Sequence, residues 1–137
     1  MLPLAEVRSR AADTPAPRDF RAALAAPGLS LVAEFKRASP SKGVILAGAD
    51  VARIVRAYTE AGAHAISVLT NEPCFGGSDD DLRRARAVTH LPILRKDFTV
   101  SAYQLYEARL IGADAALLIV AALTDGELAE FVGIAGQ

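Results

Sequence analysis

The sequence predicts an α/β fold in which parallel strands alternate with helices. Four short apolar segments have the character of strands: one that begins at residue 31, and residues 65–70, 91–98 and 115–120. Each is followed by a segment whose apolar residues recur at helical spacing. The motif Gly-Ala-X-Ala directly precedes two of the strands, at residues 62–65 and 112–115, which indicates a repeated unit. Because strands joined through helices pair in parallel with right-handed connections, we expect four successive βα units.

Composition indicates one globular domain, since 52% of the 137 residues are hydrophobic and the formal net charge is only -1. We expect residues 1–30 to form an N-terminal extension with a short helix, and residues 31–137 to form the four βα units. The near-neutral charge provides no electrostatic footprint for nucleic acid or for an anionic membrane surface. We therefore expect neither as a partner.

Three further features bear on the compartment. Cys74 is the one cysteine, so no internal disulfide forms, which is compatible with a reducing environment. The longest wholly apolar run, residues 115–123, is far shorter than the roughly 20 residues of a membrane span. The N-terminus lacks a basic region followed by an apolar core, so we expect no secretory signal. These features predict a cytoplasmic protein.

The first helices are predicted from their caps. Residues 1–16 are expected to form a short frayed helix and a connector. Asp19 is placed to cap a second short helix, which Pro27 closes before the first strand. Asp50 is placed to cap the first helix of the βα units, and Gly62 ends it.

The first strand ends in charged residues and a turn-rich loop. Because successive strand side chains point to opposite faces, Glu34 and Lys36 share a face with Val32. Their attachment points are about 6.6 Å apart, so both side chains can reach one small ligand. Ser39-Pro40 stops the strand, since proline offers no donor to a sheet. Taken alone, such a Glu/Lys pair is more often a weak surface ion pair than a catalytic couple.

The second strand leads into a predicted loop at residues 71–78 and then into a helix that opens with three aspartates. The first turn of a helix spreads adjacent side chains around its axis. We therefore interpret Asp79, Asp80 and Asp81 as complementing the helix dipole rather than as binding a metal ion. The buried stripe of this helix is expected at helical spacing: Leu82, Ala85 and Val88.

In the third strand, residues 91–98, Lys96 shares a face with Leu94 and Phe98. The pattern Ser-x-x-Gln that begins at Ser101 predicts a capping box for the helix that follows.

The fourth strand, residues 115–120, is apolar on both faces, which is typical of a central parallel strand covered by helices. Thr124 begins a second capping-box pattern, which predicts the start of the last helix. Three residues are expected to mark the buried face of that helix: Leu128, Phe131 and Val132.

Candidate site residues gather at the carboxyl ends of the predicted strands, where parallel α/β proteins bind their ligands. Glu34, Lys36 and Lys96 all lie at these ends, so we expect them to meet. Phe75 and Phe98 fall at the same edge and provide a possible apolar wall for an aromatic or planar ligand.

His64 lies elsewhere, at a helix-to-strand joint on the opposite edge. This position favours a structural role for the histidine.

Five motifs occur in a fixed order: Ala-Glu-Phe-Lys-Arg-Ala-Ser-Pro-Ser-Lys-Gly at residues 33–43, Ser-Val-Leu-Thr at 67–70, Phe-Gly-Gly-Ser at 75–78, Leu-Arg-Lys-Asp-Phe at 94–98 and Leu-Leu-Ile-Val at 117–120. Together they resemble the N-terminal half of indole-3-glycerol phosphate synthase, from about Asp19 onward. The first motif and the Arg-Lys-Asp-Phe strand end are highly specific. The resemblance implies an eight-unit TIM barrel that acts in tryptophan biosynthesis. Its members convert 1-(2-carboxyphenylamino)-1-deoxyribulose 5-phosphate to indole-3-glycerol phosphate, releasing carbon dioxide and water, without a cofactor.

The resemblance also implies roles for the matching residues. Lys96 would be the general acid that protonates the substrate ketone as the aromatic carbon attacks. Lys36, paired with Glu34, would bind the substrate and assist the later loss of hydroxide. Ser39 and its loop would contact or cover the substrate. Four side chains would pack against the anthranilate ring: Phe75, Phe98, Leu117 and Leu118.

The resemblance covers about four of the eight units, so we expect a half-barrel. The later strands would supply another catalytic carboxylate, an asparagine and most of the phosphate-binding groups, and we expect the chain to be inactive without them. An open half-barrel would also expose edge strands and an apolar inner face, which favours self-association.

Two alternatives remain open. One is a related phosphate-binding barrel enzyme such as phosphoribosylanthranilate isomerase. The set of Glu34, Lys36 and Lys96 argues against it, because that chemistry favours a cysteine and aspartate pair. The other is a half-barrel without catalytic activity that only associates with itself or binds a partner. Substrate choice tests the first alternative, and turnover together with size in solution tests the second.

Overall fold

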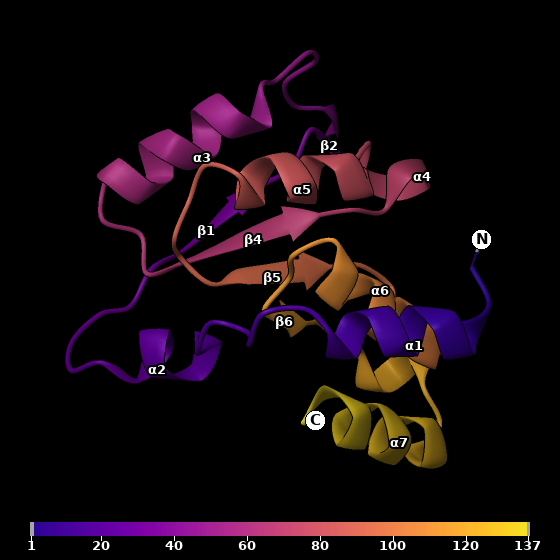
Figure 1. The fold of residues 1–137 in the computed structure, drawn as a ribbon. Helices are drawn as coiled ribbons and strands as arrows, with labels where there is room; N and C mark the ends of the chain where they lie inside the picture. Colours follow the sequence, from indigo (N-terminus) through magenta and orange to yellow (C-terminus); the bar gives the residue numbers. More distant parts are fainter. Residues whose placement is uncertain (1, 137) are drawn as a thin grey trace.

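The computed structural model describes residues 2–136, which contain a sheet of four parallel strands (Figure 1). The strands lie in the order β1 (Val32–Phe35), β4 (Ala65–Leu69), β5 (Ile93–Lys96) and β6 (Ala115–Ala116). Every neighbouring pair in this sheet is parallel, and at least one helix lies between successive strands of the sheet along the chain. The predicted parallel βα architecture is confirmed.

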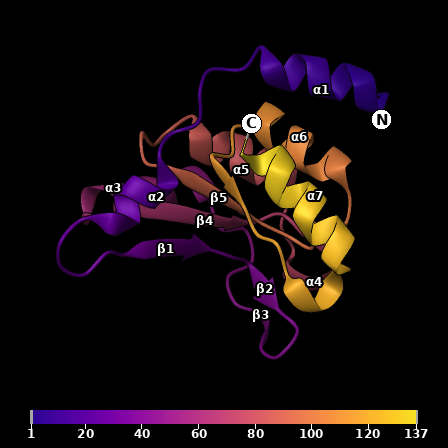
Figure 2. The ribbon, with the colours of Figure 1, turned by 90° about the horizontal axis from the view of Figure 1, so that it is seen from below.

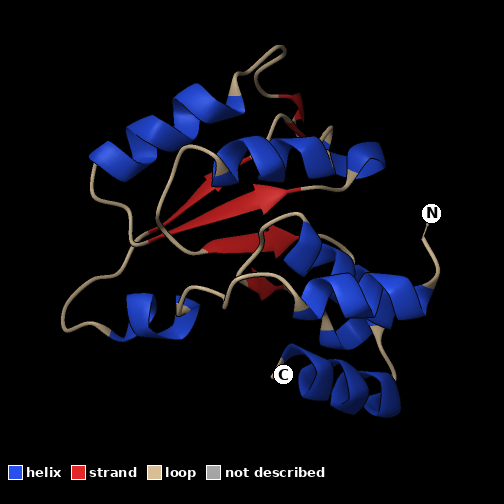
Figure 3. Ribbon diagram, in the orientation of Figure 1, coloured by secondary structure: helices blue, strands red, loops and turns tan. Residues whose placement is uncertain are grey.

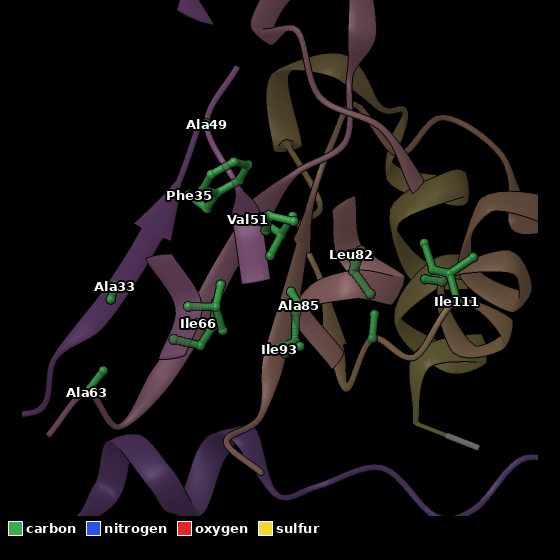
Figure 4. Close-up of a cluster of buried hydrophobic side chains, with 14 residues drawn as sticks. Ala33, Phe35, Ala49, Val51, Ala63, Ile66, Leu82, Ala85, Ile93 and Ile111 are labelled. Carbon is green, nitrogen blue, oxygen red and sulfur yellow. The ribbon is translucent and has the colours of Figure 1, made fainter. Parts of the chain in front are cut away.

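Helices cover one face of this sheet, and the hydrophobic core lies beneath them. The helices of the βα units are α3 (Val51–Glu60), α5 (Asp79–Arg86), α6 (Ala102–Leu110) and α7 (Asp125–Ala135). Figure 3 shows α3 and α5 side by side along the strands. In Figure 4, Phe35, Ile66 and Ile93 from three strands lie close to Val51 and Leu82 from these helices, and all five side chains are buried.

Strand alternation places the opposite side chains of β1 on the other face. Ala33 and Phe35 belong to the core, whereas Glu34 is half-buried and Val32 is exposed. The face assignment predicted for the first strand is therefore confirmed.

The N-terminal segment contains two helices, as predicted. α1 (Leu4–Ala12) packs against α6 and buries Val7 and Ala11. α2 (Phe20–Ala25) begins at Asp19, whose carboxylate accepts a hydrogen bond of 2.7 Å from the Ala22 N–H. Figure 2 shows α2 near the ends from which β1 and β4 start. No helix among residues 2–136 has the length and apolar character needed to cross a membrane.

The two Gly-Ala-X-Ala motifs adopt the same joint. Gly62 and Gly112 have φ values of 89° and 97°, in the left-handed region that favours glycine. Two residues later, the His64 N–H bonds to the Leu31 carbonyl and the Asp114 N–H bonds to the Ile93 carbonyl, at 2.9 and 2.8 Å. Each joint thus connects the end of a helix to the neighbouring strand, so the internal repeat is structural.

The third residue of each joint also binds through its side chain. His64 Nδ1 accepts a hydrogen bond from the Leu31 N–H, which agrees with the structural role predicted for this histidine. The Asp114 carboxylate, only 2% exposed, accepts hydrogen bonds of 2.8 Å from Arg86, from the Ile93 N–H and from the Arg18 N–H. Asp114 therefore ties the N-terminal segment and α5 to the start of β5.

The fourth strand is shorter than predicted, and it lies at an edge of the sheet rather than at its centre. β6 comprises two residues and lies at an edge of the four-stranded sheet, whereas a central strand over residues 115–120 was expected. The Leu117 N–H still bonds to the Arg95 carbonyl, but β5 ends at Lys96 and the chain then forms a 3-10 turn, η1 (Val120–Ala122). An apolar composition predicts burial and does not by itself specify strand pairing.

Two predicted loops contain regular structure. The loop at residues 71–78 includes a short helix, α4 (Glu72–Phe75), which the Asn71 side chain caps. The loop after β1 forms a small antiparallel pair, β2 (Ala38–Ser39) and β3 (Gly43–Val44).

The helix caps are largely as predicted, but one buried residue is not. Asp50 caps α3, and both capping boxes are present, at Ser101 on α6 and Thr124 on α7. On α7, Phe131 is buried, whereas Val132 is 58% exposed, so its predicted burial is wrong. In the described residues, α7 packs mainly against α6.

Replacing the buried Asp114 tests the joint that orders the start of β5. Asp114→Ala leaves the Arg86 guanidinium without its carboxylate and the Ile93 N–H without its acceptor, so we expect a loss of about 3 to 5 kcal/mol in the free energy of unfolding. Urea denaturation measures it. Glu6→Ala, which removes an exposed ion pair with Arg10, is the control and should change stability by less than about 1 kcal/mol. Equal effects of the two changes would contradict the anchoring role.

Candidate active site

A cluster of three charged side chains lies at the carboxyl ends of β1 and β5. Lys96 Nζ donates to Glu34 Oε2 at 2.8 Å, and Lys36 Nζ lies 3.5 Å from Glu34 Oε1. The exposed fractions of the side chains are 28% for Glu34, 36% for Lys36 and 40% for Lys96. The structure therefore brings together the three residues that the sequence placed at one edge, and it leaves all three accessible to a small ligand.

The contact pattern differs in one respect from the expected pair of Glu34 and Lys36. Glu34 contacts both lysines, and the shorter contact is with Lys96. The strand register explains how side chains of β1 and β5 can meet across β4. Glu34 of β1 is aligned with Ser67 of β4, and Leu69 of β4, two residues further on, is aligned with Lys96 of β5. The side chain of Lys96 reaches back across β4 to the carboxylate of Glu34.

The surroundings of Glu34 favour its ionised form. Partial burial acts to raise its pKa, but hydrogen bonds from Lys96 and Ser67 and the charges of Lys96 and Lys36 outweigh burial, so the pKa of Glu34 is lowered. Glu34 is thus a carboxylate at neutral pH and can bind ammonium groups.

Arg95 lies on the opposite face of β5 from Lys96 and holds the strand in place. Its side chain is only 6% exposed, and its guanidinium contacts groups from the ends of two strands and from two helices: Thr70, Asp79, Asp97, the Gln104 carbonyl and Glu107. The hydrogen bonds to these groups measure 2.9 to 3.2 Å, and Asp97 lies at 3.7 Å. The strand that carries Lys96 is therefore fixed from behind by one buried cation.

The segment after Lys96 is attached to the same network. Asp97 accepts hydrogen bonds from Thr70 and from the Phe98 N–H, and the Gln104 side chain donates to the Phe98 carbonyl. These bonds fix the backbone of Phe98 and therefore the position from which its ring extends.

The two predicted aromatic residues form one wall. The rings of Phe75 and Phe98 stack with centroids 6.4 Å apart and an interplanar angle of 28°. Phe75 ends α4, whose approach to the sheet depends on Gly77, because a Cβ there would lie 2.1 Å from the Leu69 carbonyl oxygen. Phe98 is 42% exposed, which leaves ring surface available to an aromatic ligand.

The loop after β1 is anchored at its base. Arg37 forms a two-pronged ion pair with the buried Asp81 and donates to the Ala49 carbonyl at 3.1 Å. Ser39 lies in β2, where its hydroxyl accepts a hydrogen bond from the Lys42 N–H. The aspartates that open α5 thus do more than complement its dipole: Asp81 binds Arg37, and Asp79 binds Arg95.

Leu117 and Leu118 follow β6 and are half-buried. If the alternation of β6 is continued, Leu117 falls on the face of Lys96 and Leu118 on the other face. Their predicted contact with a ligand stays a prediction.

Sequence reasoning missed two residues of the site region. Ser67 donates to Glu34 Oε2 at 3.0 Å, and Arg95 forms the network behind Lys96. Ser67 could have been noticed as a serine within the otherwise apolar strand 65–69. Arg95 could have been noticed as a charged residue on the same face of its strand as the buried Ile93.

The described residues offer little support for a metal centre or for a ligand site elsewhere. Among residues 2–136, no three His, Cys, Asp or Glu side chains gather so as to hold a metal ion. A cavity of about 570 Å³ lies between α1, α6, α7 and β6, lined in part by Arg8, Tyr106 and Ile134. It contains none of the strand-end cluster, and its one carboxylate, Asp114, is already engaged by Arg86.

These features define a class: a parallel βα protein of the TIM-barrel type, with a polar site at the carboxyl ends of successive strands. Comparison with known proteins narrows this class. The family model for indole-3-glycerol phosphate synthase matches residues 1–137, so the chain belongs to the indole-3-glycerol phosphate synthase family. This assignment confirms the resemblance seen in the sequence and decides against the isomerase alternative.

Proteins of that name share more than half of their aligned residues with this chain. The chain is 57% identical to indole-3-glycerol phosphate synthase of Mycolicibacterium gilvum over 120 residues, which are 88% of the chain and 44% of that protein. It is 55% identical to indole-3-glycerol phosphate synthase 2 of Streptomyces coelicolor, over 91% of the chain and 48% of that protein. For the protein of Rhizorhabdus wittichii, identity is 55% over 92% of the chain and 49% of that protein. The chain spans about half the length of the curated relatives it matches.

The lowered pKa of Glu34 predicts how its ion pairs respond to acid. Because the pKa is lower in the folded chain than its ordinary value of 4.5, ionised Glu34 stabilises the fold above that value, and this contribution disappears as the pH falls through the folded pKa. Glu34→Gln should therefore reduce the loss of stability between about pH 7 and about pH 3 in urea titrations. Glu60→Gln, at the exposed end of α3, is the matched control. If Glu34→Gln lost as much stability as the parent between these two pH values, the ion pairs of Glu34 would not stabilise the fold.

Proposed function

We propose that this chain provides the lysine and carboxylate part of an indole-3-glycerol phosphate synthase site. The reaction is the ring closure of 1-(2-carboxyphenylamino)-1-deoxyribulose 5-phosphate to indole-3-glycerol phosphate, with loss of carbon dioxide and water. The observation that carries the proposal is the Glu34 carboxylate between two accessible ammonium groups at the strand ends. Family membership supports the choice of reaction.

Lys96 is proposed as the general acid. Ring closure requires a proton donor held against the ketone oxygen while the aromatic carbon attacks. Without a substrate, Lys96 donates to Glu34 Oε2 at 2.8 Å, so its ammonium group is held at the site by a group that a ketone oxygen can replace as acceptor. The network of Arg95 behind the strand keeps the backbone of Lys96 in position during that exchange.

Lys36 is proposed to bind the substrate and to assist the later loss of hydroxide, with Glu34 as its partner. Its contact with Glu34 is the longer of the two, and its side chain is more exposed than that of Glu34. A cation in this position can turn from the carboxylate to an anionic or leaving oxygen at little cost.

The remaining predicted residues are proposed to surround the substrate. Ser39 and its loop would contact or cover it, since the loop is anchored at Arg37 next to the cluster. The stacked rings of Phe75 and Phe98, together with Leu117, would pack against the anthranilate ring. Contact of Leu118 with the ring would require the backbone to depart from strand alternation after β6.

The proposal includes the setting of the site. We infer that residues 1–30 act as an extension, that residues 31–137 are the first four units of a barrel, and that a second half supplies the phosphate site and a further carboxylate. The substrate is accordingly a small phosphorylated molecule. The single free cysteine, Cys74, supports a cytoplasmic location.

Turnover of the Lys96→Met variant tests the function. The change removes the proton donor and keeps most of the side-chain volume, so we expect a loss of turnover of about a hundredfold to ten-thousandfold with substrate binding largely retained. Formation of indole-3-glycerol phosphate is followed by fluorescence, with residues 1–137 alone and with a C-terminal half taken from the Streptomyces coelicolor relative.

The parent chain and an exposed basic residue outside the site provide the controls. Arg53→Met, on the exposed side of α3, should keep turnover within a few-fold of the parent. Full activity of Lys96→Met would remove Lys96 as the acid. Absence of product from the parent chain in both conditions would refute the proposed function.

We also propose that the chain associates with itself through its open sheet edges. Within residues 2–136, β1 and β6 each pair on one side only, and Leu31 and Val32 near the β1 edge are 51% and 38% exposed. Unpaired edges beside apolar side chains favour pairing with another chain.

Sedimentation equilibrium tests this association. We expect a concentration-dependent dimer that Leu31→Lys weakens, because a charge at a strand edge opposes pairing. Leu4→Lys, on α1 and 49% exposed in the parent, should leave the dimer intact. A parent chain that is monomeric at all concentrations would contradict the proposal.

A further inference from the structure

Ser67 is the polar residue of an otherwise apolar strand. All five residues of β4 are buried, and Ser67 is 2% exposed between Ile66 and Val68. A buried hydroxyl without a partner costs free energy, so a serine is retained at such a position only where its hydroxyl is bonded. The bond it makes is to Glu34 Oε2, at 3.0 Å.

The geometry of this bond restricts the carboxylate. Glu34 and Ser67 are aligned across β1 and β4, so the hydroxyl lies directly beside the base of the Glu34 side chain. Ser67 and Lys96 both donate to Oε2, at 3.0 and 2.8 Å, whereas Oε1 faces Lys36 at 3.5 Å. Two donors on one oxygen fix the rotation of the carboxylate and leave the other oxygen for Lys36.

From this arrangement we infer that Ser67 is a positioning residue that turns the Glu34 carboxylate so that Lys96 is held closely and Lys36 loosely. The two lysines thereby receive unequal partners, although each is close to the same carboxylate. The catalytic meaning of this inequality rests on the proposed function, in which Lys96 gives a proton and Lys36 binds the substrate. The positioning itself is a property of the unliganded chain and can be measured without turnover.

Without the hydroxyl, the carboxylate has one fewer constraint. Ser67→Ala removes the donor and one oxygen atom from a buried site and keeps the strand apolar, so the fold should persist. The Glu34 carboxylate can then rotate between the two ammonium groups, so the contact with Lys96 becomes less persistent. Ser67→Thr retains the hydroxyl and should retain the parent behaviour.

Nuclear magnetic resonance of the isotope-labelled chain can observe the lysines directly. The sequence contains three lysines, Lys36, Lys42 and Lys96, so each ammonium signal can be assigned by substitution, and Lys42 in the exposed loop is an internal reference. The measured quantities are the rate at which each ammonium group exchanges its protons with water and the titration midpoint of the Glu34 carboxyl. Thr89→Val is the matched control, because Thr89 is a buried residue in the turn between α5 and β5. Its hydroxyl bonds to the Thr59 hydroxyl and the Leu91 N–H, outside the cluster.

If Ser67 positions Glu34, the exchange of Lys96 in Ser67→Ala should become faster, toward that of Lys42, and the titration midpoint of Glu34 should rise. Ser67→Thr should restore both values, and Thr89→Val should leave both unchanged. Parent-like exchange and titration in Ser67→Ala would overturn the inference. Equal changes in Ser67→Ala and Thr89→Val would also overturn it, since they would reflect general loosening of the fold.

A kinetic measurement separates this inference from the proposed function. In the complemented barrel, Ser67→Ala should lower kcat more than it raises KM, because the close contact of Lys96 depends on the orientation of Glu34 more than the looser contact of Lys36 does, and the aromatic wall is unchanged. Absence of turnover in the parent would refute the proposed function and would leave the exchange result as the test of Ser67. A changed KM with an unchanged kcat would contradict the positioning of Lys96.

Discussion

The carboxylate of Glu34 is the group on which the strand-end site depends. It contacts both lysines of the cluster, so it offsets one of two neighbouring positive charges and leaves a net charge of one at the site. Without it, two ammonium groups would face each other across β4, which like-charge repulsion opposes. The remaining positive charge favours an anionic substrate, and the accessible ends of both lysines allow the carboxylate to be exchanged for a ligand.

The sheet supports this arrangement because successive residues of one strand face opposite ways. Arg95 and Lys96 are neighbours in sequence. Arg95 is buried and binds carboxylates of α5 and α6, whereas Lys96 is exposed beside Glu34. Arginine suits the first position because its planar guanidinium can bind several groups at once, and lysine suits the second because its single ammonium can change partners. Arg95 therefore fixes the strand to the helices, and Lys96 remains available at the strand end.

Local signals allowed the sequence to predict much of this structure. The carboxyl ends of the predicted parallel strands placed Glu34, Lys36 and Lys96 at one edge, and capping residues such as Asp19 and Asp50 marked where helices begin. Interactions between distant segments were not predictable in the same way. The short length of β6 depends on where β5 ends, and the role of Ser67 depends on its register with Glu34. Composition describes each segment, whereas register is a property of two segments together.

The contacts among Glu34, Lys36, Ser67 and Lys96 form within three adjacent strands. Glu34 and Lys36 come from the end of β1, Ser67 from β4 and Lys96 from β5, and the aromatic wall comes from the segments that follow β4 and β5. Each of these strands is paired to its neighbour, and the core beneath them is formed by side chains of the same units. The contact between Lys96, the proposed proton donor, and Glu34 therefore requires no group from outside residues 2–136. Under the proposed function, a phosphate site supplied by further units would add to a cluster that is already assembled.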